Sequence, residues 1–197
     1  EQLIVADSSG LTAWLYQKDL TPLGDSIPGP FSSAQNLAGI AANADDSLAW
    51  LTEEGDLRIT DLSGLETAAF SLALAPGELL SGLTWSAQAD GWLTVNLLSR
   101  QILRITSAGS VEVFPAEIPG GISPTSFFGG IAAREGSTNV FDLAFGSLRD
   151  NGVTRVERFV GSTPVGLGFD LSPSVNSGDI HGLASTGTGP FGFPVTY

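Results

Sequence analysis

His181 is the only histidine in the chain, and histidine is the side chain best suited to acid–base chemistry near neutral pH. Catalysis at this residue would need a serine or threonine held beside it, or carboxylates that complete a metal site. The sequence has no G-x-S-x-G, H-E-x-x-H, P-loop or dinucleotide-binding pattern that would supply such partners. We therefore interpret His181 as a packed polar residue and predict that the protein has no catalytic residues.

Acidic residues gather at three predicted turns, and such clusters raise the question of calcium. The stretches are NADD from Asn43, EEGD from Glu53 and RDNG from Arg149. Calcium needs about six to eight oxygen ligands in a defined loop, and the sequence has no D-x-[DN]-x-[DN]-G string. Hairpin turns favour Asp, Asn and Gly for backbone reasons alone. We expect no cofactor, with weak Ca2+ binding at these turns as the alternative.

The C-terminal stretch TGTGPFGFPVTY, residues 186–197, is the least ordinary segment. Its apolar residues recur at every second position, as on one face of a β-strand. Exposed aromatic side chains are costly in water, so we expect the tail to cover its own domain or to add to a neighbouring molecule. Another exposed-looking aromatic residue lies in the connection Ile27–Asn36. The predicted interface residues are Phe191, Phe193, Val195, Tyr197 and Phe31.

Composition restricts the classes of partner. The net charge is −13, from 8 Lys and Arg against 21 Asp and Glu, so the chain repels nucleic acid and anionic membrane surfaces. No apolar run approaches the roughly 20 residues of a membrane span. The absence of cysteine excludes disulfides, and charged residues make up only 15% of the chain. This low-charge composition favours a secreted protein, and the bacterial exterior in particular.

Four similar phrases recur along the chain and indicate internal repeats. They are LAGIAA from Leu37, LSGLTW from Leu80, FGGIAA from Phe128 and IHGLAS from Ile180. After each of the first three come short alternating apolar runs separated by turn residues, a pattern typical of β-hairpins. A helix over FSSAQNLAGIAANA is disfavoured because Gly39 aligns with glycines in the other phrases. Each unit is therefore expected to hold three or four strands, and the chain to be all-β.

A period of about 45 residues with four strands per unit resembles the blades of β-propellers. The N-terminal stretch Leu3–Tyr16 matches the middle of a blade, because Leu3 precedes Gly10 by the same interval as Leu48 precedes Gly55. Ile180–Ser185 would then supply the missing first strand. The resemblance implies a four-bladed propeller over residues 1–186, with one blade shared between the N- and C-terminal segments. A fragment of a larger propeller and a two-sheet sandwich remain as alternatives.

Two tryptophans, Trp50 and Trp92, fall in aligned second strands, and we expect them to pack between neighbouring blades. The positions of Trp14 and Trp85 carry no such expectation. Exposed aromatic rings could stack on sugars, which favours a glycan-binding surface as one hypothesis.

Three functions follow from these patterns. The first is a secreted, non-catalytic structural or assembly protein, a homo-oligomer or polymer that self-associates through its loops and through residues 187–197 and forms filaments or a surface layer. The alternative is an extracellular, lectin-like propeller that binds a glycan or a small ligand. A hydrolase or lyase with a site at the channel mouth has the weakest support, because a propeller fold alone does not specify a function.

Overall fold

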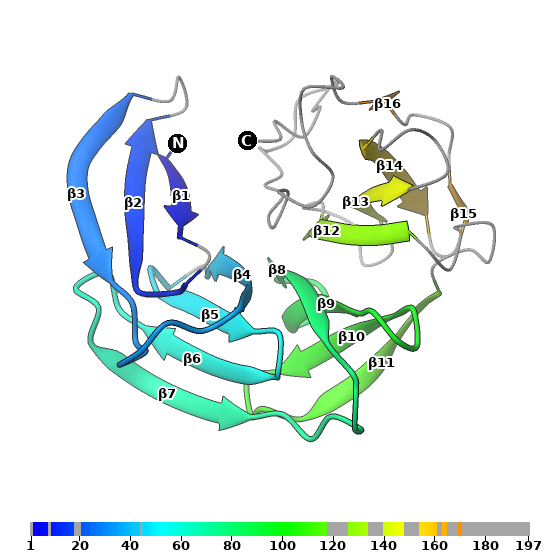
Figure 1. The fold of residues 1–197 in the computed structure, drawn as a ribbon, viewed down its shortest axis with the longest axis horizontal. Coiled ribbons are helices and arrows are strands. Elements are labelled where there is room, and N and C mark those ends of the chain that lie inside the picture. The colour runs from blue at the N-terminus through cyan, green and yellow to red at the C-terminus, as the bar shows by residue number, and fades with distance from the viewer. Residues whose placement is uncertain are drawn as a thin grey trace.

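The computed structural model describes residues 2–7, 9–17, 21–43, 45–117, 126–133, 140–147, 154–160, 163–164 and 169–170. Within these residues sixteen β-strands form four antiparallel sheets (Figure 1). The all-β expectation is therefore confirmed. The described residues contain no helix with the length and hydrophobicity that a membrane crossing requires.

The sheets follow one another along the chain, and most are meanders in which consecutive strands pair. The first contains β1 Gln2–Ala6, β2 Thr12–Gln17 and β3 Pro22–Pro28. The second contains β4 Leu37–Ala42, β5 Leu48–Thr52, β6 Asp56–Thr60 and β7 Glu66–Ser71. The third contains β8 Leu80–Ser86, β9 Gly91–Asn96, β10 Gln101–Thr106 and β11 Val111–Glu117. The fourth contains β12 Ser126–Ala133, β13 Val140–Ser147, β14 Thr154–Val160, β15 Thr163–Pro164 and β16 Phe169–Asp170.

The repeated phrases are the innermost strands. LAGIAA is β4, LSGLTW begins β8, and FGGIAA lies within β12. Figure 1 shows these three strands nearest the centre, with the other strands of each sheet fanning outward. β4 contacts β8, and β8 contacts β12, so the inner strands pack against one another. LAGIAA forms a strand, so the prediction that this stretch is not helical is confirmed. The fourth phrase, Ile180–Ser185, lies outside the described residues.

The glycine shared by the phrases coincides with a β-bulge in each inner strand. Pairing shifts register between Leu37 and Gly39, between Ser81 and Thr84, and between Phe128 and Gly130. A Cβ at Gly39 would lie 2.6 Å from the backbone nitrogen of Leu83. Gly39 is thus required because two inner backbones approach closely there, which only glycine permits.

Apolar clusters fill the spaces between neighbouring sheets. One joins the first and second sheets, and contains Ala13, Ile27, Leu37, Leu48 and Trp50. A second lies between the second and third sheets and includes Leu51, Leu57, Leu83, Trp92 and Ile105. A third includes Val95, Ile102 and Phe114 of the third sheet and Ile131 of the fourth. The expectation that Trp50 and Trp92 pack between neighbouring units is confirmed.

Polar bonds and turns also connect the sheets. The indole Nε1 of Trp92 donates to Asn43 Oδ1 at 2.8 Å, which joins the third sheet to the β4–β5 turn. The turn before β7 packs on the first sheet, since a Cβ at Gly64 would lie 2.8 Å from the carbonyl oxygen of Pro28. A glycine turn of the third sheet meets the second in the same way, where Gly109 faces Phe70. Neighbouring units therefore share a repeated mode of contact.

The first sheet has three strands where the second and third have four. The expectation that Ile180–Ser185 completes this sheet as a shared blade, and with it the count of four blades, stays a prediction. Among the described residues β1 pairs only with β2, and no strand pairing joins the fourth sheet to the first. The described residues thus form an arc of sheets around a centre that is not closed (Figure 1).

Candidate functional site

Most residues that the sequence singled out for function fall outside the described part of the chain. This holds for the tail residues Phe191, Phe193, Val195 and Tyr197 and for His181. Phe31 is described, and it is half-buried rather than exposed. Its ring packs against the cluster between the first and second sheets, beside Gly10 and Leu37. Phe31 therefore contributes to packing as well as to the surface.

Asp45 of the NADD turn and Asp61 of the β6–β7 turn accept hydrogen bonds within their own turns, whereas Asp56 of EEGD accepts from the Ser71 hydroxyl of β7. Asp61 Oδ1 accepts from the Ser63 hydroxyl at 2.6 Å and from the backbone nitrogen of Leu65 at 3.0 Å. The hydrogen bond from Ser63 is the main cause that lowers the pKa of Asp61. Asp45 accepts from the Ser47 hydroxyl at 2.6 Å, and that bond likewise lowers the pKa of Asp45. These carboxylates stabilise turns, as expected if Asp occurs there because it favours turn conformations of the backbone.

The described residues contain no group of three or more His, Cys, Asp or Glu side chains that could hold a metal ion. The RDNG turn lies outside these residues. Weak calcium binding at the acidic turns therefore stays a prediction.

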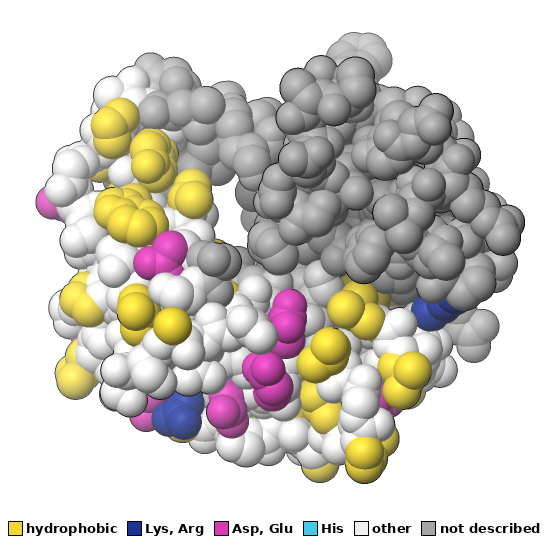
Figure 2. Space-filling model, in the orientation of Figure 1, with side chains coloured by type: hydrophobic (Ala, Val, Ile, Leu, Met, Phe, Trp, Pro, Cys, Tyr) yellow, Lys and Arg dark blue, Asp and Glu magenta, His cyan; other side chains and the backbone are white. Residues whose placement is uncertain are grey.

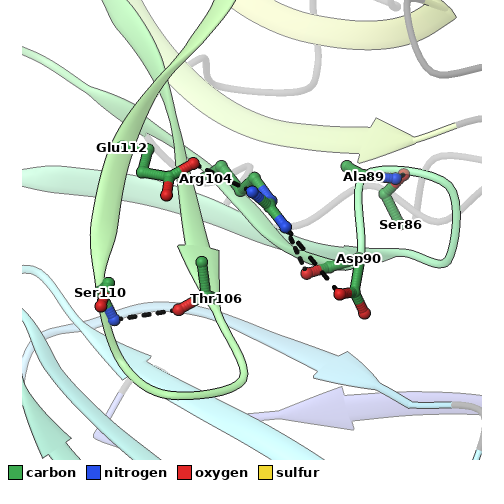
Figure 3. Close-up of polar contacts among 7 residues, drawn as sticks. All are labelled: Ser86, Ala89, Asp90, Arg104, Thr106, Ser110 and Glu112. Atoms are coloured by element: carbon green, nitrogen blue, oxygen red, sulfur yellow. Dashed lines mark hydrogen bonds and ion pairs between the residues drawn. The ribbon is translucent and has the colours of Figure 1, made fainter.

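Two arginines occupy the same position in a short repeat, Leu-Arg-Ile-Thr, at residues 57–60 and 103–106. Arg104 Nη1 donates to Glu112 at 2.9 Å, and Nη2 donates to the carbonyl oxygen of Asp90 at 3.0 Å (Figure 3). Arg58 Nη1 lies 3.2 Å from the carboxylate of Glu66. Each guanidinium thus binds a carboxylate of its own sheet, which suits a structural role better than recognition of an anion.

The first sheet leaves one face uncovered. Val5 and Trp14 lie directly opposite each other on β1 and β2, and their side chains are 41% and 39% exposed. Their neighbours Ile4 and Ala13 point to the other face and pack toward the second sheet. Figure 2 shows apolar side chains on the surface over the first sheet, in the upper left of the view. A cross-strand pair of this kind, Trp beside Val, is a flat apolar surface on which a partner could pack.

In the second sheet β5 is buried on both faces, whereas the outer strand β7 has an open edge. β7 pairs only with β6 in the described structure. After Glu66, its residues Thr67–Ser71 contain neither a charge nor a proline, and the uncharged run TAAFSLALA continues past the end of the strand to Ala75. The other outer edges are different: β3 contains Pro22, Asp25 and Pro28. β11 contains Glu112, Pro115 and Glu117. Charges and prolines are the usual means by which edge strands avoid pairing with other chains, and β7 has neither after its first residue, Glu66.

Sequence reasoning missed both surfaces. The exposed face of the first sheet could not be found because Val5 and Trp14 are ordinary strand residues whose exposure depends on neighbours. The β7 edge did carry a signal, the uncharged run TAAFSLALA, but only the sheet order shows that this strand is outermost.

No family model matches the chain, and no curated protein matches it. Solved structures of other proteins do match it in fold. Virginiamycin B lyase from Staphylococcus aureus has 17% identity and a TM-score of 0.51, over 92% of this chain and 55% of that one. A protein of unknown function from Bacteroides thetaiotaomicron has 11% identity and a TM-score of 0.58, over 93% of this chain and 51% of that one. A streptogramin B lyase has 11% identity and a TM-score of 0.55, over 93% of this chain and 69% of that one.

These similarities concern the fold. The lyases are β-propellers, so the resemblance of the repeats to propeller blades is confirmed. The chain spans only about half the length of the first two structures.

Proposed function

We propose that this chain is a secreted, non-catalytic structural propeller that self-associates into oligomers or polymers. The observation that carries the proposal is the outer edge of the second sheet, where β7 pairs only with β6 among the described strands. The strand residues Thr67–Ser71 contain neither a charge nor a proline. An edge strand of this kind is stabilised when a strand of another molecule pairs with it.

Charge supports an apolar mode of association. Two copies that each carry −13 repel one another, so association needs contacts in which no charge is buried. Residues Thr67–Ser71 of β7 and residues 187–197 contain no charged side chain. The low fraction of charged residues supports an extracellular location.

The proposal includes a four-bladed ring with one shared blade. β1 has no inner neighbour among the described strands, whereas β5 and β9 pair with β4 and β8. Ile180–Ser185 repeats the phrase that forms those inner strands, so it is the segment suited to complete the first sheet. The ring would leave residues 187–197 free for association.

The proposal includes no reaction. The lyase names of two structural relatives describe those proteins, at identities that indicate the fold alone. Asp45 and Asp61 accept hydrogen bonds within their own turns, and Asp56 accepts from Ser71 of the neighbouring strand, which favours structural roles.

Sedimentation velocity over a wide concentration range, with negative-stain electron microscopy, tests the proposal. We expect the full chain to form assemblies that grow with concentration, and deletion of residues 187–197 to reduce them to monomers. A full chain that remains monomeric at every concentration would contradict self-association.

The alternative is a glycan-binding propeller, which the exposed ring of Trp14 favours. An exposed indole on a sheet face can stack on a sugar ring. A glycan array, followed by titration of any bound sugar with the wild-type protein and with Trp14→Ala, tests this function. Binding that Trp14→Ala removes would support it, and an array without binding at high protein concentration would contradict it.

A further inference from the structure

We propose that the outer edge of β7 is the acceptor site for the C-terminal tail, residues 187–197, of a second copy of this chain. The tail would add to the second sheet as a fifth strand. This inference rests on the proposed self-association and names the two surfaces that meet.

The edge of β7 is suited to accept a strand because its outward backbone groups have no strand partner among the described residues. The uncharged part of the strand, Thr67–Ser71, is long enough to pair with five residues of the tail. Prolines in β3 and β11 remove backbone donors, and charged residues in both resist a covering strand. Among the outer strands β3, β7 and β11, only β7 has five consecutive residues without a charge or a proline, Thr67–Ser71.

Apolar side chains lie beside this edge to receive the tail's aromatic residues. Ala68 and Phe70 of β7 pack toward the third sheet. On the facing side of the third sheet, Val113 lies opposite Leu103 and therefore points toward the second sheet. Val113 is 56% exposed, although its partner Leu103 is buried. A strand added to β7 could cover this valine with one of its aromatic side chains.

The tail's own sequence fits strand addition at one edge only. Phe191, Phe193, Val195 and Tyr197 alternate with the positions that contain the two prolines, Pro190 and Pro194. In a strand, residues two apart direct their backbone groups to the same side. Pro190 and Pro194 therefore direct their backbone groups to one side of the strand. The four apolar residues direct theirs to the opposite side, where every residue has an N–H group. The tail can pair with β7 through the side of the apolar residues, while the prolines on the other side prevent a further strand from adding.

The reach of the chain favours a neighbouring molecule over the same one. In the proposed ring the tail leaves the inner edge of the first sheet, and the six Cα–Cα steps from Ser185 to Phe191 extend at most about 22 Å. A strand added outside β7 lies four strand spacings of about 4.8 Å outward and one sheet spacing of about 10 Å across. The direct line alone is about 22 Å and passes through packed side chains. A path around them exceeds the reach of the connection.

Such a contact joins different surfaces on the two copies. A head-to-tail contact of this kind does not close upon itself unless its rotation forms a ring, so it generates filaments. The inference therefore predicts open-ended assemblies rather than closed dimers.

Substitution of an exposed β7 residue in the full chain tests the acceptor site. Ala69→Glu places a charge on the edge strand opposite Arg58, where a carboxylate is compatible with the fold. Ala87→Glu makes the same substitution at an exposed position of the turn between β8 and β9. Sedimentation should show association weakened about tenfold or more by Ala69→Glu and little changed by Ala87→Glu. Equal effects of the two variants would overturn the inference, even if the wild-type chain assembles.

Mixing two defective variants tests the pairing of surfaces directly. Ala69→Glu retains the tail, and Phe193→Asp retains the β7 edge. Thr196→Asp, in the set that contains the prolines, is the charge-matched control for the tail. We expect each defective variant to remain monomeric alone, and an equimolar mixture to form a one-to-one complex that grows no further. Absence of that complex, or assembly by Phe193→Asp equal to that of Thr196→Asp, would show that the tail does not bind this edge.

Discussion

The first and second sheets are built from the same kind of unit, and they differ in what surrounds them. In the first, the Val5–Trp14 pair is exposed on one face, while the outer strand β3 is protected by Pro22, Asp25 and Pro28. In the second, β5 is buried on both faces, while the outer strand β7 has an unprotected edge. The comparison teaches that coverage by neighbouring sheets, more than strand sequence, decides which surface of a unit remains available.

Replacement of a tryptophan by alanine should give the largest difference in stability loss between the two sheets. Trp50 is fully buried between the sheets, so Trp50→Ala should lower the free energy of unfolding by about 3–5 kcal/mol. Trp14 lies on the uncovered face, so Trp14→Ala should lower it by no more than about 1 kcal/mol. Urea unfolding of both variants measures the difference. Equal losses would mean that the face of the first sheet is covered in solution.

The buried polar bond of the second sheet gives the next largest effect. Trp50 Nε1 donates to Thr60 Oγ1 at 3.0 Å, with both groups buried. Thr60→Val preserves the shape and leaves the indole N–H without this acceptor, at a cost of about 1–3 kcal/mol. Thr12→Val, on half-buried β2 of the first sheet, should change stability by about 0.5 kcal/mol or less. A Thr60→Val protein as stable as wild type would show that another acceptor replaces the hydroxyl.

A matched glycine pair tests the contact between the two sheets. Gly24 and Gly64 both have positive φ, at 79° and 86°, so alanine strains the backbone at either position. A Cβ at Gly24 meets nothing within 4 Å, whereas one at Gly64 would lie 2.8 Å from the carbonyl oxygen of Pro28. Gly64→Ala should therefore cost about 1–2 kcal/mol more than Gly24→Ala. Similar melting temperatures for the two variants would argue that this turn does not press on the first sheet in solution.

The smallest effect concerns pH. Hydrogen bonds lower the pKa of Asp61 in the folded state, so its contribution to stability is present above the unfolded carboxyl value and is lost as pH falls through the folded value. Asp61→Asn should reduce stability near neutral pH and have no effect in strong acid. Urea unfolding curves of the wild type and of Asp61→Asn, measured near neutral pH and in strong acid, test this.

Ser63→Ala provides the control, because it removes the hydroxyl that donates to Asp61. It should reproduce part of the neutral-pH loss, and the double variant should lose less than the sum of the two single variants. If the double variant loses as much stability as the two single variants together, the Asp61 and Ser63 side chains stabilise the fold independently of their hydrogen bond.

Much of the fold could be predicted from the sequence because local patterns determine it. The phrases around Gly39, Gly82 and Gly130 mark the inner strands, since each places a glycine at a β-bulge. The inward packing of Trp50 and Trp92 followed from their alignment in second strands. Phe31 shows the limit: a residue among prolines and glycines looks exposed in sequence, yet it packs against Leu37 from the next sheet.

The sequence by itself determined the all-β class, the repeating unit and the turns, because alternation, glycine and turn residues act over a few positions of the chain. Only the tertiary structure decided which surfaces are left uncovered. Exposure of Trp14 and the outermost place of β7 depend on which sheets lie beside them, and those neighbours are distant in sequence. The physical reason is that burial is a property of contacts between units, whereas strand formation is a property of the unit itself.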